Sequence, residues 1–500
     1  MKRVSGYAGK RGSASAGKRG SASAGKRVSA YAGKRVRADL GARCRPVFAY
    51  RFTRLPAYIL APLALVLYLA HPGSAAAQAD RCVFQITNVD RQGAVVETPQ
   101  GTNYFAGGNV KLSCRGAPIT MQSDSVASYG GNVVHFIGHV KYRDSTLTMD
   151  ADNGTYYKNG EKWEARGRVV TNNLRTGSKM TGPALDYYRV VKGVRDTLVM
   201  YSTGRPRIEY ATSEPGAKPG EPYIIVADRV RLKGSDRLWA GGKVAIDRSD
   251  FSARGDSLRL DTGKAGDGTL TGRNPVMRGL GPDSFNLTGR RLDLKLDGRD
   301  LTYVIAKGNG HAVSKEWDLV ADTIGLDVTN RRLEQTLAWG DSIRPYASSP
   351  AYAMRADSLA LDTPGQQLKE VRGFGTAWLG GTIDARTKQR DWMRGDTVVA
   401  QFVQRDSAGT RRAALNRIVA RKNAQSFHLD QSPRYPERPS INYARGDVIV
   451  MTMKHGARSG VDRVDVQGLV DGLQLEASDA AAADSAGTRP DTVSRGQRSR

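Results

Sequence analysis

The stretch Val226-Ala227-Asp228-Arg229-Val230-Arg231-Leu232 contains the phrase that decides the fold: an apolar residue, a small residue, Asp, a polar residue and then alternating aliphatic residues. Because each copy of such a phrase can bury its apolar residues only against its neighbours, its repetition indicates stacked supersecondary elements. We therefore predict an all-β fold, an elongated stack of antiparallel strands. Further copies of the phrase occupy residues 253–260, 320–326, 354–361, 393–398 and 444–449.

The alternation of apolar residues changes phase at each Asp. Ala227 and Val230 are three residues apart, and Ala253 and Leu258 are five apart, so the gap across the Asp is odd. In a flat strand an odd gap would turn the aliphatic side chains to opposite faces, so one shared interior requires a bulge or corner at the Asp. Asp suits such a position because its side chain satisfies nearby backbone N–H groups. We predict β-jellyroll repeats whose structural corners are Asp152, Asp228, Asp256, Asp322, Asp357, Asp396 and Asp447.

The first 79 residues differ from the rest in composition. Residues 1–54 contain fifteen Lys and Arg and one acid in a repeating Ala-Gly-Lys-Arg pattern, so we expect a disordered basic leader rather than a nucleic-acid-binding arm. Residues 55–79 are uncharged and aliphatic and end in small residues, which is typical of a secretory signal peptide cleaved after Ala79. A retained N-terminal anchor is the alternative, although the apolar run is short for a membrane span of about 20 residues.

The remaining chain divides by its turn residues. We assign residues 80–213 to a first β unit, the Pro- and Gly-rich segment 214–222 to a linker or a long hairpin tip, and residues 223–476 to further β repeats. Residues 477–500 have no periodicity, and we expect a disordered tail. Of the formal charge of +27, the leader carries +14, which leaves +13 on residues 80–500 and suits an anionic partner.

Few residues indicate chemistry. Cys82 and Cys114 follow the signal segment and suit one disulfide in an oxidising compartment, with a free Cys82 as the alternative. His135 and His139 have helical metal-ligand spacing, but in a strand they stand about 13 Å apart, too far for one ion. No phosphate-binding loop or nucleophile elbow precedes a helix. We therefore predict no metal site, no cofactor, no nucleic-acid partner and no enzymatic activity.

Three motifs resemble a known family. The sequences at 133–140, 147–152 and 165–169 follow the order F-x-G-x-V, L-x-A-D and A-x-G-x-V, and residues 415–426 and 442–449 continue the pattern. In this order the chain resembles the OstA-like domain of Gram-negative lipopolysaccharide-transport proteins, over about residues 121–476. Arg421-Lys422 departs from the family, which often has an acidic residue or Gly there.

The resemblance implies a non-enzymatic conduit in the periplasm, associated with the outer or inner membrane, whose apolar groove shields lipopolysaccharide acyl chains. It also implies that other lipopolysaccharide-transport proteins pair with the open edge strands. A scaffold without a lipid ligand and a β-helical polysaccharide-active enzyme remain as alternatives. The residues that would contact lipid, or form dry core, are Val134, Phe136, Met149, Ala151, Val230, Leu232, Leu258, Leu260, Leu292, Leu294, Ile324, Leu326, Leu359 and Leu361.

Overall fold

The computed structural model describes residues 82–91, 93–211, 220–263, 266–280, 284–298, 300–385, 387–407, 410–430, 439–454 and 460–476. The chain divides into two units, residues 1–73 and 74–500, and every described residue belongs to the second unit. The predictions for the basic leader, the signal segment 55–79 and the tail 477–500 fall outside the described residues. Within the described ranges, no helix is long and apolar enough to cross a membrane.

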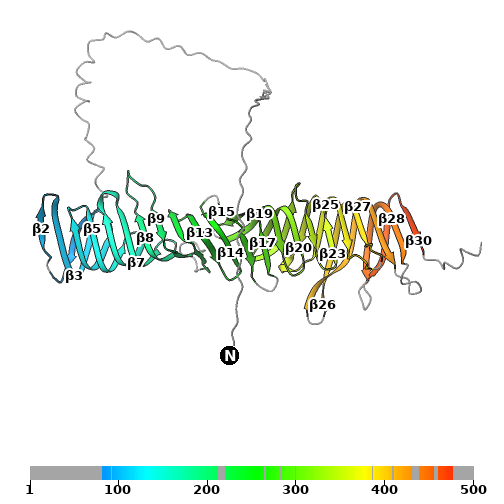
Figure 1. Ribbon diagram of the computed structural model, residues 1–500, viewed down its shortest axis with the longest axis horizontal. Coiled ribbons are helices and arrows are strands. Elements are labelled where there is room, and N and C mark those ends of the chain that lie inside the picture. Colours follow the sequence, from blue (N-terminus) through cyan, green and yellow to red (C-terminus); the bar gives the residue numbers. More distant parts are fainter. Residues whose placement is uncertain are drawn as a thin grey trace, which may run out of the picture. The chain divides into compact units, whose positions relative to one another are not determined.

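The described strands form one sheet of antiparallel pairs, which confirms the all-β prediction. They follow one another in a row in Figure 1, from β2 at the blue end to β30 at the red end. Short 3₁₀ turns occur at η2 (Lys158–Gly160) and η3 (Pro364–Gln366). In the first half of the row the strands are β1 (Val83–Asn88), β2 (Val95–Thr98), β3 (Gly101–Arg115), β4 (Thr120–Tyr129), β5 (Val133–Arg143), β6 (Leu147–Tyr157), β7 (Lys162–Asn173), β8 (Lys179–Tyr188), β9 (Val199–Thr203), β10 (Arg207–Tyr210), β11 (Tyr223–Val226), β12 (Arg229–Lys233), β13 (Arg237–Asp247), β14 (Phe251–Asp261) and β15 (Asp267–Thr271).

The second half of the row continues the same pattern of long and divided strands. Its members are β16 (Val276–Gly279), β17 (Phe285–Thr288), β18 (Arg291–Asp297), β19 (Asp300–Val313), β20 (Asp318–Thr329), β21 (Arg332–Trp339), β22 (Tyr346–Ser348), β23 (Tyr352–Arg355), β24 (Ser358–Asp362), β25 (Glu370–Gly381), β26 (Trp392–Ser407), β27 (Thr410–Asp430), β28 (Ser440–Lys454), β29 (Gly460–Gln467) and β30 (Asp471–Leu475).

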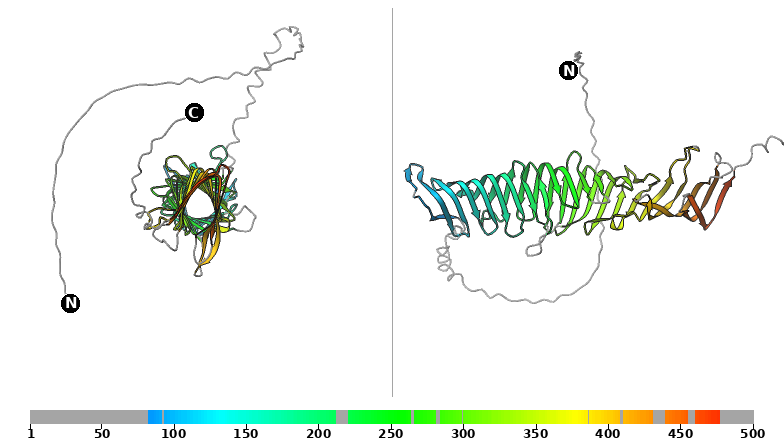
Figure 2. Two further views of the ribbon diagram at one scale, coloured as in Figure 1. Left: turned by 90° about the vertical axis from the view of Figure 1, so that its right-hand side faces the viewer. Right: turned by 90° about the horizontal axis from the view of Figure 1, so that it is seen from below.

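The sheet is folded lengthwise into two walls that face each other. Wall A begins at β2 and ends at β29, and wall B begins at β1 and ends at β30. A long strand such as β5 contributes to both, because residues 133–137 pair in wall A and residues 140–143 pair in wall B. The other long strands divide in the same way, and Figure 2 shows the resulting folded outline along the row of strands.

The fold between the walls is made by two alternating kinds of corner. Several strands that run from wall A to wall B, among them β5, β13, β19 and β25, turn through two consecutive left-handed residues, such as Gly138 (φ 76°) and His139 (φ 44°) in β5. Most strands that run from wall B to wall A turn at an Asp, such as Asp152 in β6, whereas β8 turns at Pro183 and the chain between β17 and β18 turns at Arg290. A Cβ on Gly138 would overlap the Asp124 carboxylate of the preceding strand, so the Asp and Gly corners pack directly together.

Each of the seven corner aspartates lies at a strand break or register shift. Asp228 and Asp357 fall in breaks, between β11 and β12 and between β23 and β24. Asp256 instead stays within β14, and the extra residues belong to the neighbouring β13, between Gly241 and Val244. The prediction placed the irregularity on the Asp strand itself. The structure shows that the Asp often faces a bulge whose two left-handed residues lie on the adjacent strand. At the other positions, Asp152, Asp322, Asp396 and Asp447 also lie at or opposite register shifts.

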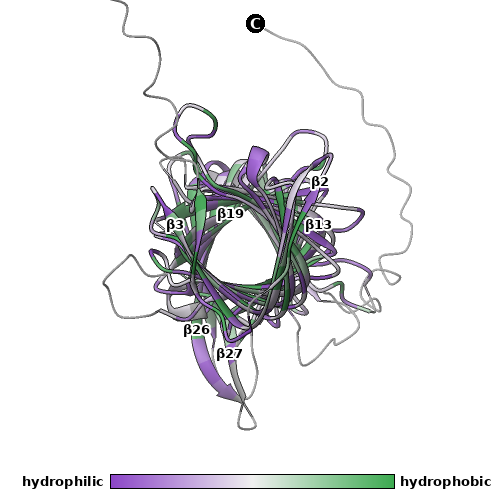
Figure 3. Ribbon diagram, turned by 90° about the vertical axis from the view of Figure 1, so that its left-hand side faces the viewer, coloured by the Kyte–Doolittle hydropathy of each residue, from purple (hydrophilic) through white to green (hydrophobic). Residues whose placement is uncertain are grey.

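The sheet continues across the segment assigned to a linker. Tyr210 of β10 pairs directly with Tyr223 of β11, so these two strands are neighbours in wall B, and residues 212–219 between them lie outside the described residues. In the C-terminal half of the row, the hairpin formed by β26 and β27 extends beyond the neighbouring strands (Figure 3), and the projecting part of β26 is hydrophilic. The described strands therefore form one continuous stack on both sides of residue 214.

Candidate functional site

The space between the two walls holds one apolar cluster that runs along the described strands. Phe136 in wall A and Val110 in wall B have no exposed surface, and the cluster continues through Leu292 to Ile449 near the other end. Of the predicted interior residues, all but Leu232 are buried, and Leu232 packs against the same cluster. The buried ones are Val134, Phe136, Met149, Ala151, Val230, Leu258, Leu260, Leu292, Leu294, Ile324, Leu326, Leu359 and Leu361.

Aromatic rings join the walls near the N-terminal end of the row. The ring of Tyr142 in wall B lies 5.0 Å from that of Trp163 in wall A, measured between centroids. The ring of Phe84, in β1 of wall B, lies 5.0 Å from that of Tyr156 in wall A. Aromatic pairs at such separations and angles add to the stability that burial provides. The two walls therefore share one interior rather than two separate cores.

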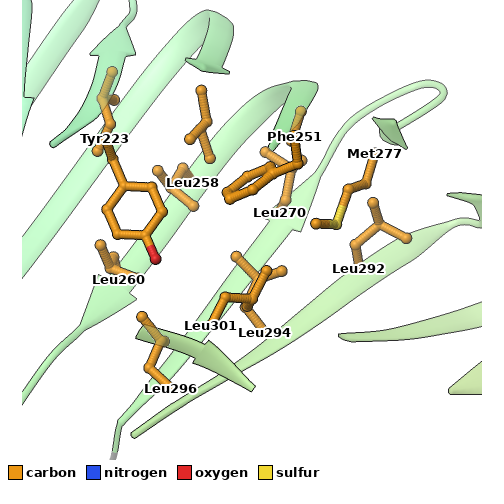
Figure 4. Close-up of a pocket in the computed structure, with 13 residues that line it drawn as sticks. Tyr223, Phe251, Leu258, Leu260, Leu270, Met277, Leu292, Leu294, Leu296 and Leu301 are labelled. Atoms are coloured by element: carbon orange, nitrogen blue, oxygen red, sulfur yellow. The ribbon is translucent and has the colours of Figure 1, made fainter. Parts of the chain in front are cut away.

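Figure 4 shows a cavity near the middle of this interior, lined only by side chains of apolar residues and Tyr223. Tyr223, Phe251 and Met277 come from wall B, and Leu258 and Leu292 come from wall A. Its free volume is about 30 Å³, the share of one water molecule in the liquid. A typical ligand pocket has about 300–1,000 Å³. A fatty acyl chain can therefore enter here only if the two walls move apart.

On the side opposite the corners, the hairpin turns of wall A form one rim and the hairpin turns of wall B form a second rim. We call the opening between these two rims the mouth. Contacts between the rims close the mouth. In the first of them, Asp144, in the wall B turn 144–146, accepts a hydrogen bond from the hydroxyl of Tyr187 of wall A at 2.7 Å. The same Asp144 oxygen accepts a bond from Tyr142 at 2.9 Å. Burial, followed by the charge of Asp144, raises the pKa of both tyrosines.

A second closure binds the first strand. Glu161, in the wall A turn after η2, is buried and accepts a hydrogen bond from the backbone N–H of Cys82 at 3.2 Å. Its other oxygen accepts bonds from Arg189 Nε at 2.6 Å and from the hydroxyl of Tyr156. The structure also joins Cys82 and Cys114 in a disulfide, with Cα atoms 5.1 Å apart. These contacts hold the start of β1 against both rims.

A third closure lies beside the central cavity. Arg248, in the wall B turn 248–250, has a side chain that is 1% exposed and donates hydrogen bonds to Asp250 and to the hydroxyl of Tyr223. Its guanidinium also lies 3.6 Å from Asp300, at the wall A rim. Burial opposes the charge of Arg248, but the hydrogen bonds and nearby carboxylates outweigh it and raise its pKa. The mouth is therefore closed here by a buried cation.

A fourth closure lies towards the C-terminal end. Glu316, in the wall B turn between β19 and β20, accepts hydrogen bonds from the backbone N–H groups of Leu368 at 3.3 Å and Ala413 at 3.1 Å. Leu368 precedes β25, and Ala413 lies at the base of the β26–β27 hairpin, both in wall A. One carboxylate thus satisfies two backbone donors across the mouth. These closures are separate from one another, and each is made by a charged side chain in a different hairpin turn.

The corner residues carry charge on the outside. Arg168 binds Asp152 with its guanidinium at 2.9 Å and with its backbone N–H at 3.0 Å, and these hydrogen bonds lower the pKa of Asp152. Corner pairs of the same kind occur between Arg205 and Asp228 at 3.1 Å and between Arg344 and Asp357 at 2.7 Å. The predicted corner aspartates therefore act locally, on the backbone and cations of neighbouring strands and turns.

Sequence reasoning missed the residues that close the mouth. Asp144, Glu161, Arg248 and Glu316 each lie in a different hairpin turn, where charged residues are expected for solubility alone. Their partners are up to 97 residues away along the chain. The sequence carries no local signal for such pairs. The left-handed Gly corners did have a signal, because Gly followed by a polar residue recurs one strand after several of the Asp residues, as at Gly167 after Asp152, Gly242 after Asp228 and Gly375 after Asp357.

The described residues also include the histidines and acidic residues that could bind a metal ion. Among them, no group of three or more His, Cys, Asp or Glu side chains is arranged to hold a metal ion. His139 pairs with Asp124 at 2.7 Å, and His135 contacts the Thr155 hydroxyl at 3.1 Å, so these histidines have different partners. In comparisons with known proteins, no family model matches the chain and no curated protein matches it.

Proposed function

We propose that this chain is a periplasmic conduit that binds the acyl chains of lipopolysaccharide in the interior between its two walls during transport to the outer membrane. One observation carries the proposal: a single apolar interior extends through the described layers and is closed along its open side by separate polar contacts. An acyl chain that replaced wall-to-wall packing would keep apolar surface buried at about 25 cal/mol per Å². Since neighbouring layers resemble one another, the energy of such a chain changes little as it slides.

Entry would take place laterally, through the mouth. Opening one closure exposes a polar group that water can hydrate, so its cost is modest compared with exposing the core. A lipid that enters between the rims can then separate the walls progressively along the row. This mode of entry explains how a packed interior with little free volume accommodates a ligand.

The partners we propose are other lipopolysaccharide-transport proteins, which would pair with the outermost strands. Among the described strands, β1 and β2 pair only with β3, and β29 and β30 pair only with β28, so both ends of the described stack present edges that no described strand covers. Apolar side chains are exposed at each end, including Val95 at 62% and Leu469 at 89%. Such edges are suited to β-augmentation by another sheet.

A photocrosslinking experiment tests the conduit. A benzophenone amino acid placed at Leu258 or Leu294 faces the interior, whereas Arg259 and Lys295, one residue later in the same strands, are exposed on the outside. We expect purified full-length protein incubated with lipopolysaccharide to crosslink from the first pair and not from the second. Crosslinks from the outward positions alone, or from none, would contradict an acyl-chain site in the interior.

One observation favours a second candidate, a scaffold that binds no lipid. The cavity between Phe251 and Leu292 has a free volume of only about 30 Å³, as a permanently packed core would require. In that case no interior position crosslinks to lipid, although the protein remains folded. The β-helical enzyme is a weaker candidate, because that fold needs parallel pairing and the described strands pair antiparallel.

A further inference from the structure

A concave site of about 590 Å³ lies on the outer face of wall B, over β1 and β3 to β6. Its position outside the apolar interior follows from the alternation of the strands, because Leu112 and Tyr142 point into the core while their neighbours along the chain are exposed or half-buried. The volume is within the range of ligand sites, about 300–1,000 Å³. The outward residues in its lining include Lys111, Ser113, Thr120, Gln122, Lys141 and Arg143.

The strand register gathers these residues into two adjacent rows. In one row, Lys111 pairs with Gln122, which pairs with Lys141. In the next row, Thr120 lies between its partners Ser113 and Arg143. With strands about 4.8 Å apart and about 6.6 Å between alternate residues, the three cations stand within about 12 Å of one another. Their flexible side chains can therefore reach one ligand.

These three cations outnumber the carboxylates that line the site, where Asp150 is the one acidic residue of the described lining. Among the described residues, no carboxylate lies within ion-pair distance of Lys111, Lys141 or Arg143. The contrast with the other wall is clear, because Lys162 and Arg166 both pair with Asp186, at 3.1 and 2.8 Å. Clustered cations in a concave surface attract an anion whose charge complements them.

The rest of the lining suits a sugar that carries the anion. Thr120, Thr148 and Gln122 offer hydroxyl and amide groups, and Asp150, the cross-strand neighbour of Lys141, offers acceptor oxygens for sugar hydroxyls. Arg and Lys bind phosphate oxygens through strong, charge-assisted hydrogen bonds. A phosphorylated sugar combines both kinds of group in one ligand.

The site also lies at the mouth. Arg143 directly precedes the wall B turn that contains Asp144, and Ser113 and Thr120 flank the turn before β4. We propose that this surface binds the phosphorylated sugar headgroup of a lipid whose acyl chains enter the mouth beside it. The proposal rests on the proposed function and adds a headgroup site to it. The headgroup stays in water on the outer face while the chains pass over the wall B rim.

The test compares two full-length double variants of equal charge change. Lys141→Glu with Arg143→Glu reverses the site, and Arg259→Glu with Lys295→Glu reverses two exposed cations on the outside of wall A. The probes are a diphosphorylated, acylated glucosamine disaccharide in detergent micelles and the same lipid after removal of its phosphates. We expect the first variant to bind the phosphorylated lipid at least tenfold more weakly and the dephosphorylated lipid as the wild type does. The wall A variant should stay within twofold for both probes.

Several outcomes would overturn the headgroup site: equal weakening in both variants, no weakening in the first, or a wild-type protein that does not distinguish the two lipids. A Lys141→Arg variant, which keeps the charge, should bind normally, and circular dichroism establishes that each variant is folded. Crosslinking from Leu258 separates this site from the conduit. If crosslinking persists when phosphate dependence is absent, only the headgroup site fails. In the opposite case, an unacylated phosphorylated disaccharide binds, its binding requires Lys141 and Arg143, and Leu258 never crosslinks to lipid. That result would contradict only the proposed conduit.

Discussion

At the residue scale, the fold depends on corners in which a left-handed Gly packs against an Asp. The Asp half of this unit was predictable, because an odd gap in the apolar alternation requires an irregularity. The Gly half was not predicted, although Gly375 follows Asp357 by one strand just as Gly242 follows Asp228. Alternation of apolar residues reports which face a side chain occupies, but it does not report the sign of φ. The sequence therefore did not predict which of two paired strands carries the extra residue, and the structure was needed to show it.

The Gly corner gives a first prediction. Gly375 has a φ of 75°, and a Cβ there would overlap the carboxylate of Asp357. We expect Gly375→Ala to lower the free energy of opening of β25 by about 2–4 kcal/mol, from left-handed strain of about 1–2 kcal/mol and displacement of the Asp. Hydrogen exchange of peptides from β25 measures this energy.

A matched glycine controls for backbone strain alone. Gly193 has a φ of 77°, but the space around its Cβ position is open. Gly193→Ala should therefore cost only about 1–2 kcal/mol. An equal effect of the two substitutions would show that the contact between Gly375 and Asp357 contributes nothing.

The corner of β27 gives a second prediction, because it departs from the rule. Here Lys422 (φ 56°) and Asn423 (φ 53°) are both left-handed, and Lys422 occupies the place of the Gly. We expect Lys422→Gly to stabilise β27 by about 0.5–1 kcal/mol, since it removes strain of about 1–2 kcal/mol and adds an entropic cost of about 0.5–1 kcal/mol. Arg421→Gly, one residue earlier and outside the left-handed set, should destabilise the strand instead. Hydrogen exchange of β27 reports both, and a loss of protection in Lys422→Gly would contradict the assignment.

At the scale of elements, the hairpin turns do more than connect strands. Asp144 and Glu161 belong to turns of opposite walls, and each accepts hydrogen bonds from the other wall. Strand positions and the stacking of walls could be predicted from periodicity, because one buried face imposes alternation along each strand. Which turn of wall A faces which turn of wall B depends on how far the two walls are offset along the row. The geometry of the corners sets this offset, and no local sequence pattern reports it.

The tyrosines at Asp144 give a third prediction. Burial, reinforced by the Asp144 charge, raises the pKa of Tyr142 and Tyr187 well above the ordinary value of 10.0, against a smaller lowering effect of Arg189. Their contribution to stability is therefore complete below pH 10. Above it the unfolded chain loses two protons that the folded chain keeps, so stability falls by about 2.8 kcal/mol per pH unit.

Urea unfolding between pH 8 and pH 11.5 tests this dependence. We expect the double variant Tyr142→Phe with Tyr187→Phe to be less stable than the wild type at pH 8, because Asp144 loses two buried donors at about 1–3 kcal/mol each. Above pH 10 its stability should fall less steeply than that of the wild type. Parallel curves for the two proteins would show that the tyrosines do not titrate differently on folding.

At the scale of the whole described stack, each layer contacts only its neighbours, so stability is distributed along the row rather than concentrated in one core. A central strand such as β14 has a paired strand on both sides in each wall, whereas β30 pairs only with β28 and all of its residues are exposed. Because layers stack on their neighbours, an acyl chain would meet similar sites along the row. For the same reason, an end layer has a neighbour on one side and makes about half the contacts of a central layer. Sliding of a ligand and fraying of the ends would therefore both follow from the stacking of similar layers.

This arrangement gives a fourth prediction, a gradient of amide hydrogen exchange along the chain. We expect β29 and β30 to exchange fastest, β13 to β20 slowest, and β1 at an intermediate rate, because the disulfide of Cys82 with Cys114 and the Glu161 contact retain it. Reduction of the disulfide should accelerate exchange in β1 and leave β14 and β30 unchanged, since the effect of a local opening decays over neighbouring layers. Exchange that is uniform along the chain, or that rises everywhere on reduction, would mean that the stack opens as one cooperative unit. A lipid could then not separate the walls one layer at a time, and lateral entry would require the whole mouth to open together.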